Sequence, residues 1–176
     1  VNGQEISMSD LIKQNNAFYQ TKIDTVSRQE QLKYQEQLLN LLTENKDYAI
    51  KIFSIEKGGK KPRKDISKWA EVKDYISYFF DDMFDGAFEV PENIEKEDAK
   101  KILAAYKESY DENADKDKWF SDIKALCEPL GFTPNVKEYK KNPESYKGSL
   151  SDICTCLRVA ITNKSNTPDM FKYPKF

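Results

Sequence analysis

Hydrophobic side chains recur every three or four residues along most of this chain, with polar residues between them. This spacing places the apolar side chains on one face of an α-helix, and no segment shows the two-residue alternation of a strand. We therefore expect an all-α fold, a helical bundle of six to seven helices. Only six glycines and seven prolines interrupt the 176 residues, which agrees with helices and few turns.

The first third of the chain predicts several consecutive helices. Ser7 or Ser9 opens a polar helix that runs through Phe18. Ser27 and Glu30 have the spacing of a capping box, so a further helix is expected to start there. The apolar face of this helix would consist of Leu32, Leu38, Leu39 and Leu42. The helical pattern continues to residue 56.

The rest of the chain shows four more patterned segments. The pair Gly58–Gly59 predicts the end of the preceding helix, and a strong amphipathic pattern runs from Asp65 to Gly86. A helix is expected over residues 94–110, and a second helix follows, which Asp115 or Asp117 caps and Gly131 closes. After a loop over residues 132–148, the last helix runs from the capping box Ser149–Asp152 to Ile161, and a turn-rich tail begins at residue 163. We divide the chain into helical subdomains of residues 1–59 and 60–176.

The composition excludes several kinds of chemistry. The chain contains no histidine, and therefore neither Ser-His-Asp nor Cys-His catalysis nor histidine-ligated zinc. Cys127, Cys154 and Cys156 are an odd number without the spacing of a redox or zinc motif, so we interpret them as reduced, buried thiols of a cytoplasmic protein. We find no catalytic residues, no metal site and no apolar run that could span a membrane.

A basic loop lies between the helical patterns. Five of the eight residues 57–64 are positively charged, although the chain has a net charge of −2. Lysines suit phosphates as point charges, arginine offers a bidentate fork, and the two glycines let the backbone come close to a ligand. The pattern predicts a local phosphate-binding patch, and a merely solvated loop is the alternative. The candidate residues are Lys57, Lys60, Lys61, Arg63, Lys64 and the nearby Lys68.

Arginines and aromatic residues provide further candidates. Besides Arg28 and Arg63, the chain has only Arg158, which lies beside the apolar stripe of the last helix. Arg158 either makes a contact for which planar guanidinium geometry matters or forms an ion pair with a neighbouring helix, and we favour the structural role. We assign to the core Trp69, Phe79, Phe80, Trp119 and Phe120. The candidates for surface contacts with unpaired bases are Tyr75, Tyr78, Tyr139 and Tyr146.

The segment Lys60–Trp69, followed by Val72–Phe79, resembles the C-terminal half of bacterial glutamyl-tRNA synthetases, especially clostridial ones. The same resemblance extends over Trp119–Phe132, a lysine-rich loop, Lys147–Asp152, Leu157–Thr162 and Asn166–Pro168, and covers about residues 25–176 in all. Ile161 stands where the family usually has Leu, and Asn163 where it has Gly. Asparagine is the usual substitute for glycine at a left-handed helix cap.

The resemblance implies an anticodon-binding region of a class I enzyme that ligates glutamate to tRNA(Glu) with ATP. The family's ATP-binding signatures have no counterpart here, so catalysis, ATP and magnesium would belong to a half that this chain lacks, and no cofactor is expected in this piece. The implied partner is the anticodon stem-loop of tRNA(Glu), bound by a monomer; residues 1–59 would contact the stem and residues 60–176 the anticodon. The implied RNA-binding residues are Lys57, Lys60, Lys61, Arg63, Lys64, Lys68 and Arg158.

Two other classes of function stay open. The acidic helices and the net charge of −2 also suit an α-helical protein–protein interaction domain without an RNA role. An enzyme that uses carboxylates would need a deep pocket with paired acids, for which the sequence gives no sign. One contiguous positive face would favour RNA, whereas an exposed apolar groove would favour a protein partner.

Overall fold

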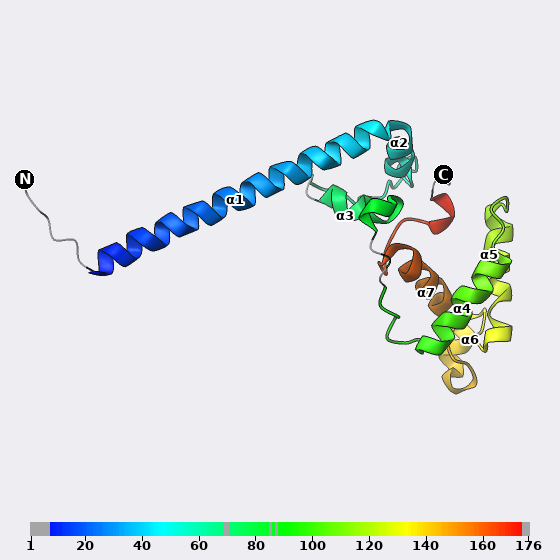
Figure 1. The fold of residues 1–176 in the computed structure, drawn as a ribbon. Coiled ribbons are helices and arrows are strands. Elements are labelled where there is room, and N and C mark those ends of the chain that lie inside the picture. The colour runs from blue at the N-terminus through cyan, green and yellow to red at the C-terminus, as the bar shows by residue number, and fades with distance from the viewer. Residues whose placement is uncertain (1–7, 69–70, 85, 87, 174–176) are drawn as a thin grey trace, which may run out of the picture. The chain divides into compact units, whose positions relative to one another are not determined.

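The computed structural model describes residues 8–68, 71–84, 86 and 88–173. Within these ranges the chain forms seven α-helices and several 3-10 turns but no strand, which confirms the predicted all-α class (Figure 1). The chain divides into two compact units, residues 1–49 and residues 50–176. The functional boundary that we expect between residues 59 and 60 stays a prediction.

The first unit consists mainly of one long helix, α1, which spans Met8–Glu44. Ser27 lies inside this helix, so the predicted helix start there is wrong. No glycine or proline interrupts residues 8–44, and hydroxyls within the helix bond to carbonyls one turn back, as Thr21 does to Ala17 at 2.9 Å. Because helix-internal hydroxyls can be satisfied in this way, a capping-box sequence does not by itself end a helix.

The middle of the chain contains less helix than its pattern predicts. Helix α2 comprises Lys46–Ser54, and α3 only Val72–Ile76. Two 3-10 turns follow, η2 (Ser77–Phe79) and η3 (Asp81–Met83). The predicted helix from Asp65 to Gly86 is therefore wrong at both ends, although the core positions Val72, Ile76, Phe79 and Phe80 are buried as expected. The carboxylate of Asp65, where the predicted helix begins, binds two cations of the preceding loop.

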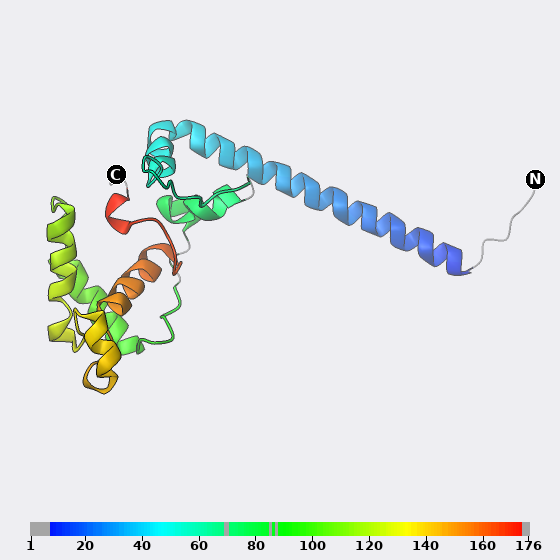
Figure 2. The ribbon, with the colours of Figure 1, turned by 180° about the vertical axis from the view of Figure 1, so that it is seen from behind.

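The core of the second unit surrounds α7, Leu150–Thr162. Helices α4 (Lys96–Ser109) and α5 (Lys116–Ala125) both pack against α7, as the front and back views show (Figure 1; Figure 2). The most deeply buried members of this core are Ile102, Ile123, Cys127, Ile153, Cys156 and Leu157. Cys154 is half-buried, and all three cysteines are free thiols, as predicted.

Two helix starts that rest on capping side chains, those of α5 and α7, are predicted correctly. Asp115 accepts a hydrogen bond from the Lys118 backbone N–H at 2.8 Å at the start of α5. At the start of α7, the Ser149 backbone N–H donates to the Asp152 carboxylate at 2.6 Å. These caps are local interactions between residues three apart, so the sequence alone specifies them.

The segment 132–148 is more ordered than the predicted loop. It contains α6 (Val136–Lys141) and the 3-10 turn η5 (Pro143–Ser145). Asn135 caps α6 by accepting hydrogen bonds from two backbone N–H groups, at 3.0 and 3.3 Å. A parallel bridge between Thr133 and Ser149 ties the ends of the segment together. A helix of six residues has too little periodicity to be recognised in the sequence.

Asn163 provides a test of the cap that ends α7. Its backbone is left-handed (φ 55°), and its N–H donates to the Val159 carbonyl at 2.7 Å. Asn163→Ala should lower the free energy of unfolding by about 1 kcal/mol, because a β-carbon without a polar group is strained in this conformation. Asn163→Gly should leave it unchanged or raise it by a few tenths of a kcal/mol. Urea unfolding of both variants checks this, and an alanine variant as stable as the glycine variant would contradict it.

Candidate functional site

The basic loop, residues 57–64, follows α2 and is closed by its own backbone. Helix α2 ends at Ser54, and the left-handed residue after it is Glu56 (φ 56°), not a glycine. The Arg63 backbone N–H then donates to the Glu56 carbonyl at 3.1 Å. The expectation that Gly58–Gly59 terminate the helix is therefore wrong, since neither glycine has a positive φ.

The carboxylate of Asp65 holds the basic loop in shape by binding two of its cations. This carboxylate accepts a charge-assisted hydrogen bond from Arg63 Nε and lies 3.3 Å from Lys57 Nζ. Lys57 Nζ also donates to the Arg63 carbonyl, and Arg63 Nη2 donates to Asn166 Oδ1 at 3.0 Å. Lys57 and Arg63, two of the seven predicted RNA-binding residues, are thus engaged in holding the loop in shape.

The other cations of the loop point to solvent. Lys60, Lys61 and Lys64 are exposed and form no ion pair with any residue that the structure describes. Lys68, just beyond the loop, is exposed as well. A β-carbon added at either Gly58 or Gly59 would meet no atom within 4 Å, so the backbone there faces open space. The loop therefore offers accessible positive charge beside an unobstructed stretch of main chain.

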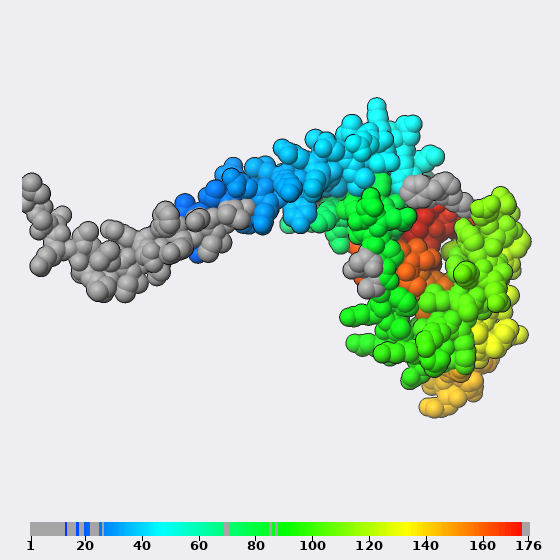
Figure 3. All heavy atoms as spheres, viewed as in Figure 1, coloured from blue at the N-terminus to red at the C-terminus, as the bar shows by residue number. Residues whose placement is uncertain are grey.

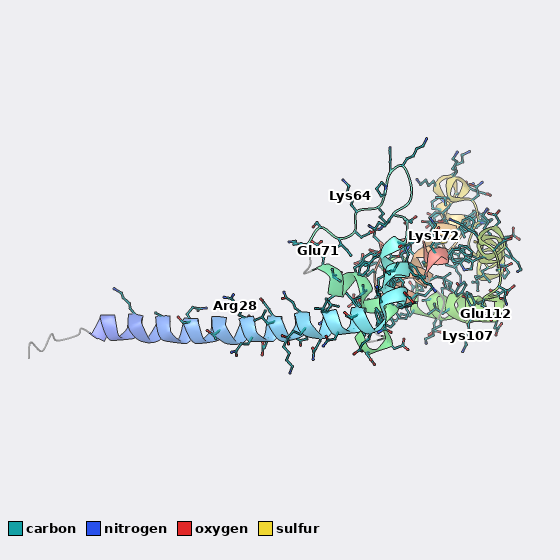
Figure 4. All side chains as sticks on the ribbon, turned by 90° about the horizontal axis from the view of Figure 1, so that it is seen from above. Arg28, Lys64, Glu71, Lys107, Glu112 and Lys172 are labelled. Atoms are coloured by element: carbon teal, nitrogen blue, oxygen red, sulfur yellow. The ribbon has the colours of Figure 1, made fainter. Side chains whose placement is uncertain are left out.

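A first cleft, which we call the lysine cleft, lies on one side of the loop. It has a volume of about 660 Å³ and is lined by both glycines together with Lys51, Lys61 and Lys172. Of the described residues that line it, Glu56 alone is acidic, and the Glu56 carboxylate lies 3.9 Å from Lys172 Nζ (Figure 4 labels Lys172). Three cations against one carboxylate make this cleft electropositive.

A second cleft, the tyrosine cleft, lies where the loop meets α3 and the segment 164–168. It has a volume of about 490 Å³, and Lys64 and Glu71, both labelled in Figure 4, line it. The other lining residues are Arg63, Asp65, Asp74, Tyr75, Tyr78, Lys164, Asn166, Thr167 and Pro168. Lys164 Nζ donates to the Asp74 carbonyl at 2.6 Å and also binds its carboxylate. The lining of this cleft therefore offers both hydrogen-bond donors and hydrogen-bond acceptors.

Tyr75 is the most unusual group in the tyrosine cleft. Its side chain is only 7% exposed, and its hydroxyl has no hydrogen-bond partner among the described residues. Burial, together with the charge of Asp65, raises the pKa of Tyr75 to about 12. Burial also raises the pKa of Tyr78. Both phenols stay neutral at physiological pH, and the Tyr75 hydroxyl remains a buried donor without an acceptor.

The other sequence candidates have mixed outcomes. The surface role expected for Tyr75 is wrong, and so is the core assignment of Phe120, which is 39% exposed. Tyr139 and Tyr146 are half-buried, and the Tyr146 hydroxyl donates to Glu138 at 2.8 Å. Trp69 lies outside the described residues.

Arg158 does not form the ion pair that the sequence favours. It is half-buried in α7, its Nε has no hydrogen-bond partner, and no salt bridge joins it to another described residue. Burial raises the pKa of Tyr173, although the hydrogen bond with Thr167 and the positive charge of Arg158 act in the opposite direction. The role of Arg158 stays a prediction.

Sequence reasoning missed Lys51, Lys164, Asn166 and Lys172. None of them belongs to a charge cluster in the sequence, and only folding brings them to the loop. Asn166 lies in a segment that carries the family resemblance, and this was the one available signal. Among the described residues there is no helix that could cross a membrane and no group of three potential metal ligands.

No family model and no solved structure matches this chain significantly. Curated proteins do match. The glutamate–tRNA ligase of Clostridium perfringens (strain 13 / Type A) is 44% identical over 142 residues, which are 78% of this chain and 26% of that protein. The ligases of Acetivibrio thermocellus and Sorangium cellulosum are 42% and 32% identical over 139 residues, with 79% and 78% of this chain and 26% and 24% of their own lengths covered. The chain is homologous to a region of clostridial glutamate–tRNA ligases, and it spans about a quarter of the length of these relatives.

Tyr75→Phe tests the unpartnered hydroxyl. Removing it should leave the free energy of unfolding at pH 7 unchanged or raise it by up to about 1 kcal/mol, because no hydrogen bond is lost. A tyrosine pKa raised in the native state costs stability as pH rises from about 10 towards 12, since only the unfolded chain ionises there. The variant should therefore lose less stability than the unsubstituted chain over this interval in urea unfolding.

Tyr173→Phe is the matched control. Its hydroxyl donates to Thr167 Oγ1 at 2.6 Å, so this variant should lose about 1 kcal/mol at pH 7. Equal losses from both substitutions would show that the Tyr75 hydroxyl has a partner after all.

Proposed function

We propose that this chain binds the anticodon arm of tRNA(Glu) as the C-terminal part of a glutamate–tRNA ligase. The observation that carries the proposal is the group of exposed lysines, Lys60, Lys61 and Lys64, on a braced loop between two clefts. The homology to a region of glutamate–tRNA ligases makes a tRNA the natural polyanion for this surface.

The lysine cleft suits the phosphate backbone of the RNA. Lys51, Lys61 and Lys172 converge on it, and the two glycines leave the main chain open to close approach. Phosphate contacts of this kind release counterions and so supply affinity, but they do not distinguish one sequence from another. This cleft would position the stem.

The tyrosine cleft suits the edge of an unpaired base. Lys64 and Asn166 can donate hydrogen bonds, and Glu71 can accept them. Proteins that read RNA sequence do so mainly on splayed single-stranded bases, through aromatic surfaces and hydrogen bonds to base edges. The tyrosine cleft would therefore distinguish between bases, while the lysine cleft would bind the phosphate backbone.

Catalysis would belong to the rest of the ligase. A chain without histidine cannot contain the His-Ile-Gly-His type motif of the family's ATP site. Activation of glutamate with ATP and magnesium would thus take place in another part of the enzyme, in the cytoplasm, and the present chain would contribute tRNA binding.

The double substitution Lys60→Glu with Lys61→Glu tests the loop as a phosphate contact. Binding of a tRNA(Glu) transcript, followed by fluorescence anisotropy at several salt concentrations, should weaken about tenfold or more. The slope of log K against log salt should become shallower by about 1.4–1.8, because each lost phosphate contact removes about 0.7–0.9.

Lys100→Glu with Lys101→Glu is the matched control. It makes the same change in net charge on exposed positions of α4, and it should leave the slope nearly unchanged. If both double variants change the affinity and the slope equally, binding follows bulk charge and the loop is not the contact.

A further inference from the structure

The second unit contains an aromatic cavity that the RNA proposal does not use. It lies between the end of α4, the start of α5, the end of α7 and the 3-10 turn η6 (Met170–Lys172), and its volume is about 610 Å³. This is the size range of small-molecule sites. Figure 3 shows the green end of α4 and α5 close to the red C-terminal segment on this face.

Aromatic rings held by one another form the walls of this cavity. The Trp119 indole N–H donates to the Tyr106 hydroxyl at 3.0 Å, and the Trp119 and Phe171 ring centroids lie 5.7 Å apart. The Tyr106 and Tyr110 rings lie 5.7 Å apart as well. Tyr110 is 48% exposed, so part of this aromatic surface is open to solvent. The walls are therefore pre-arranged π-surfaces that a ligand can reach.

The charge at the cavity is negative. Asp111 and Glu112 line it, and among the described residues Lys107 is the only basic one in its lining; Lys107 and Glu112 are labelled in Figure 4. Of the lysines that begin α5, Lys116 pairs with Asp169 and Lys118 with Asp122, although the charge of Lys118 also interacts with Asp111. An RNA phosphate would be repelled here.

The combination of aromatic faces and carboxylates selects a particular kind of ligand. An ammonium group with apolar substituents is attracted by the negative faces of aromatic rings and loses little hydration when it enters such a site. A small metal ion is disfavoured, because the described residues offer no group of three ligands and Asp111 Oδ1 already accepts the Asn113 backbone N–H at 2.9 Å. A neutral apolar ligand would gain nothing from the acids.

We propose that this cavity binds a small organic cation that carries a compact alkylammonium group. The cationic head lies against the rings of Tyr110 and Trp119, and the carboxylate of Glu112 supplies the opposite charge. The site is independent of the basic loop, so it stands or falls separately from the proposed RNA contacts.

Trp119 makes the proposal measurable. The chain has two tryptophans, so Trp69→Phe leaves Trp119 as the only indole, and its fluorescence reports on the cavity. The probe is choline, and its control is 3,3-dimethyl-1-butanol, which has the same shape without the charge. Choline should change the Trp119 emission saturably and bind about 2- to 30-fold more tightly than the alcohol, the range expected of a cation–π contact. Calorimetry on the unsubstituted chain repeats the comparison without the Trp69 substitution.

Two substitutions at Tyr110 separate the ring from mere apolar surface. Tyr110→Phe keeps the π-face and should retain choline binding, whereas Tyr110→Leu should weaken it about 2- to 5-fold. Glu112→Gln should weaken choline and leave the alcohol unaffected. Equal affinity for choline and the alcohol would make the cavity a plain apolar pocket, and the absence of a saturable response to choline by both methods would end the proposal.

Discussion

The carboxylate of Asp65 is the constraint on which the candidate site depends. Its side chain is only 12% exposed, and a carboxylate this far from water is costly unless cations surround it. Lys57 and Arg63, from the two ends of the basic loop, meet this requirement, and Arg63 extends the connection to Asn166, which is 103 residues further along the chain. One buried acid thus closes the loop and joins it to the C-terminal segment. Because Lys57 and Arg63 turn inward to bind Asp65, the remaining lysines of the loop are exposed to solvent.

The outward-facing lysines of the loop give this acidic chain a local positive surface. A net charge of −2 spread over 176 residues would not attract a polyanion, but an outward group of lysines beside an open main chain can. The electropositive lysine cleft lies on one side of the loop, and the tyrosine cleft, with mixed donors and acceptors, lies where the loop meets α3. We infer a division of labour in which one cleft supplies affinity and the other supplies selectivity. The acidic, aromatic cavity of the same unit has the opposite electrostatic character.

The sequence predicted those features that neighbouring residues determine. The caps at Asp115 and Ser149 involve only residues within one turn, and both are found. The left-handed cap at Asn163, which the family resemblance implies, is found as well. Ser27 misled because a serine can lie inside a long helix. The amphipathic pattern after Asp65 misled because it is α-helical only over Val72–Ile76 and continues in 3-10 turns. The sequence predicted that the basic loop is positively charged, but not which of its cations face the solvent. Which cations turn inward depends on Asp65, and the lysines that complete the clefts come from distant segments.

The most direct test of this account is the affinity of Asp65→Asn for a tRNA(Glu) transcript at moderate salt. The substitution makes the chain more positive by one charge, so simple attraction to a polyanion predicts tighter binding. A loop that depends on Asp65 predicts weaker binding, because Lys57 and Arg63 lose their common partner and the loop no longer presents Lys60, Lys61 and Lys64 together. Binding that is unchanged or tighter would show that the braced loop is not what holds the RNA.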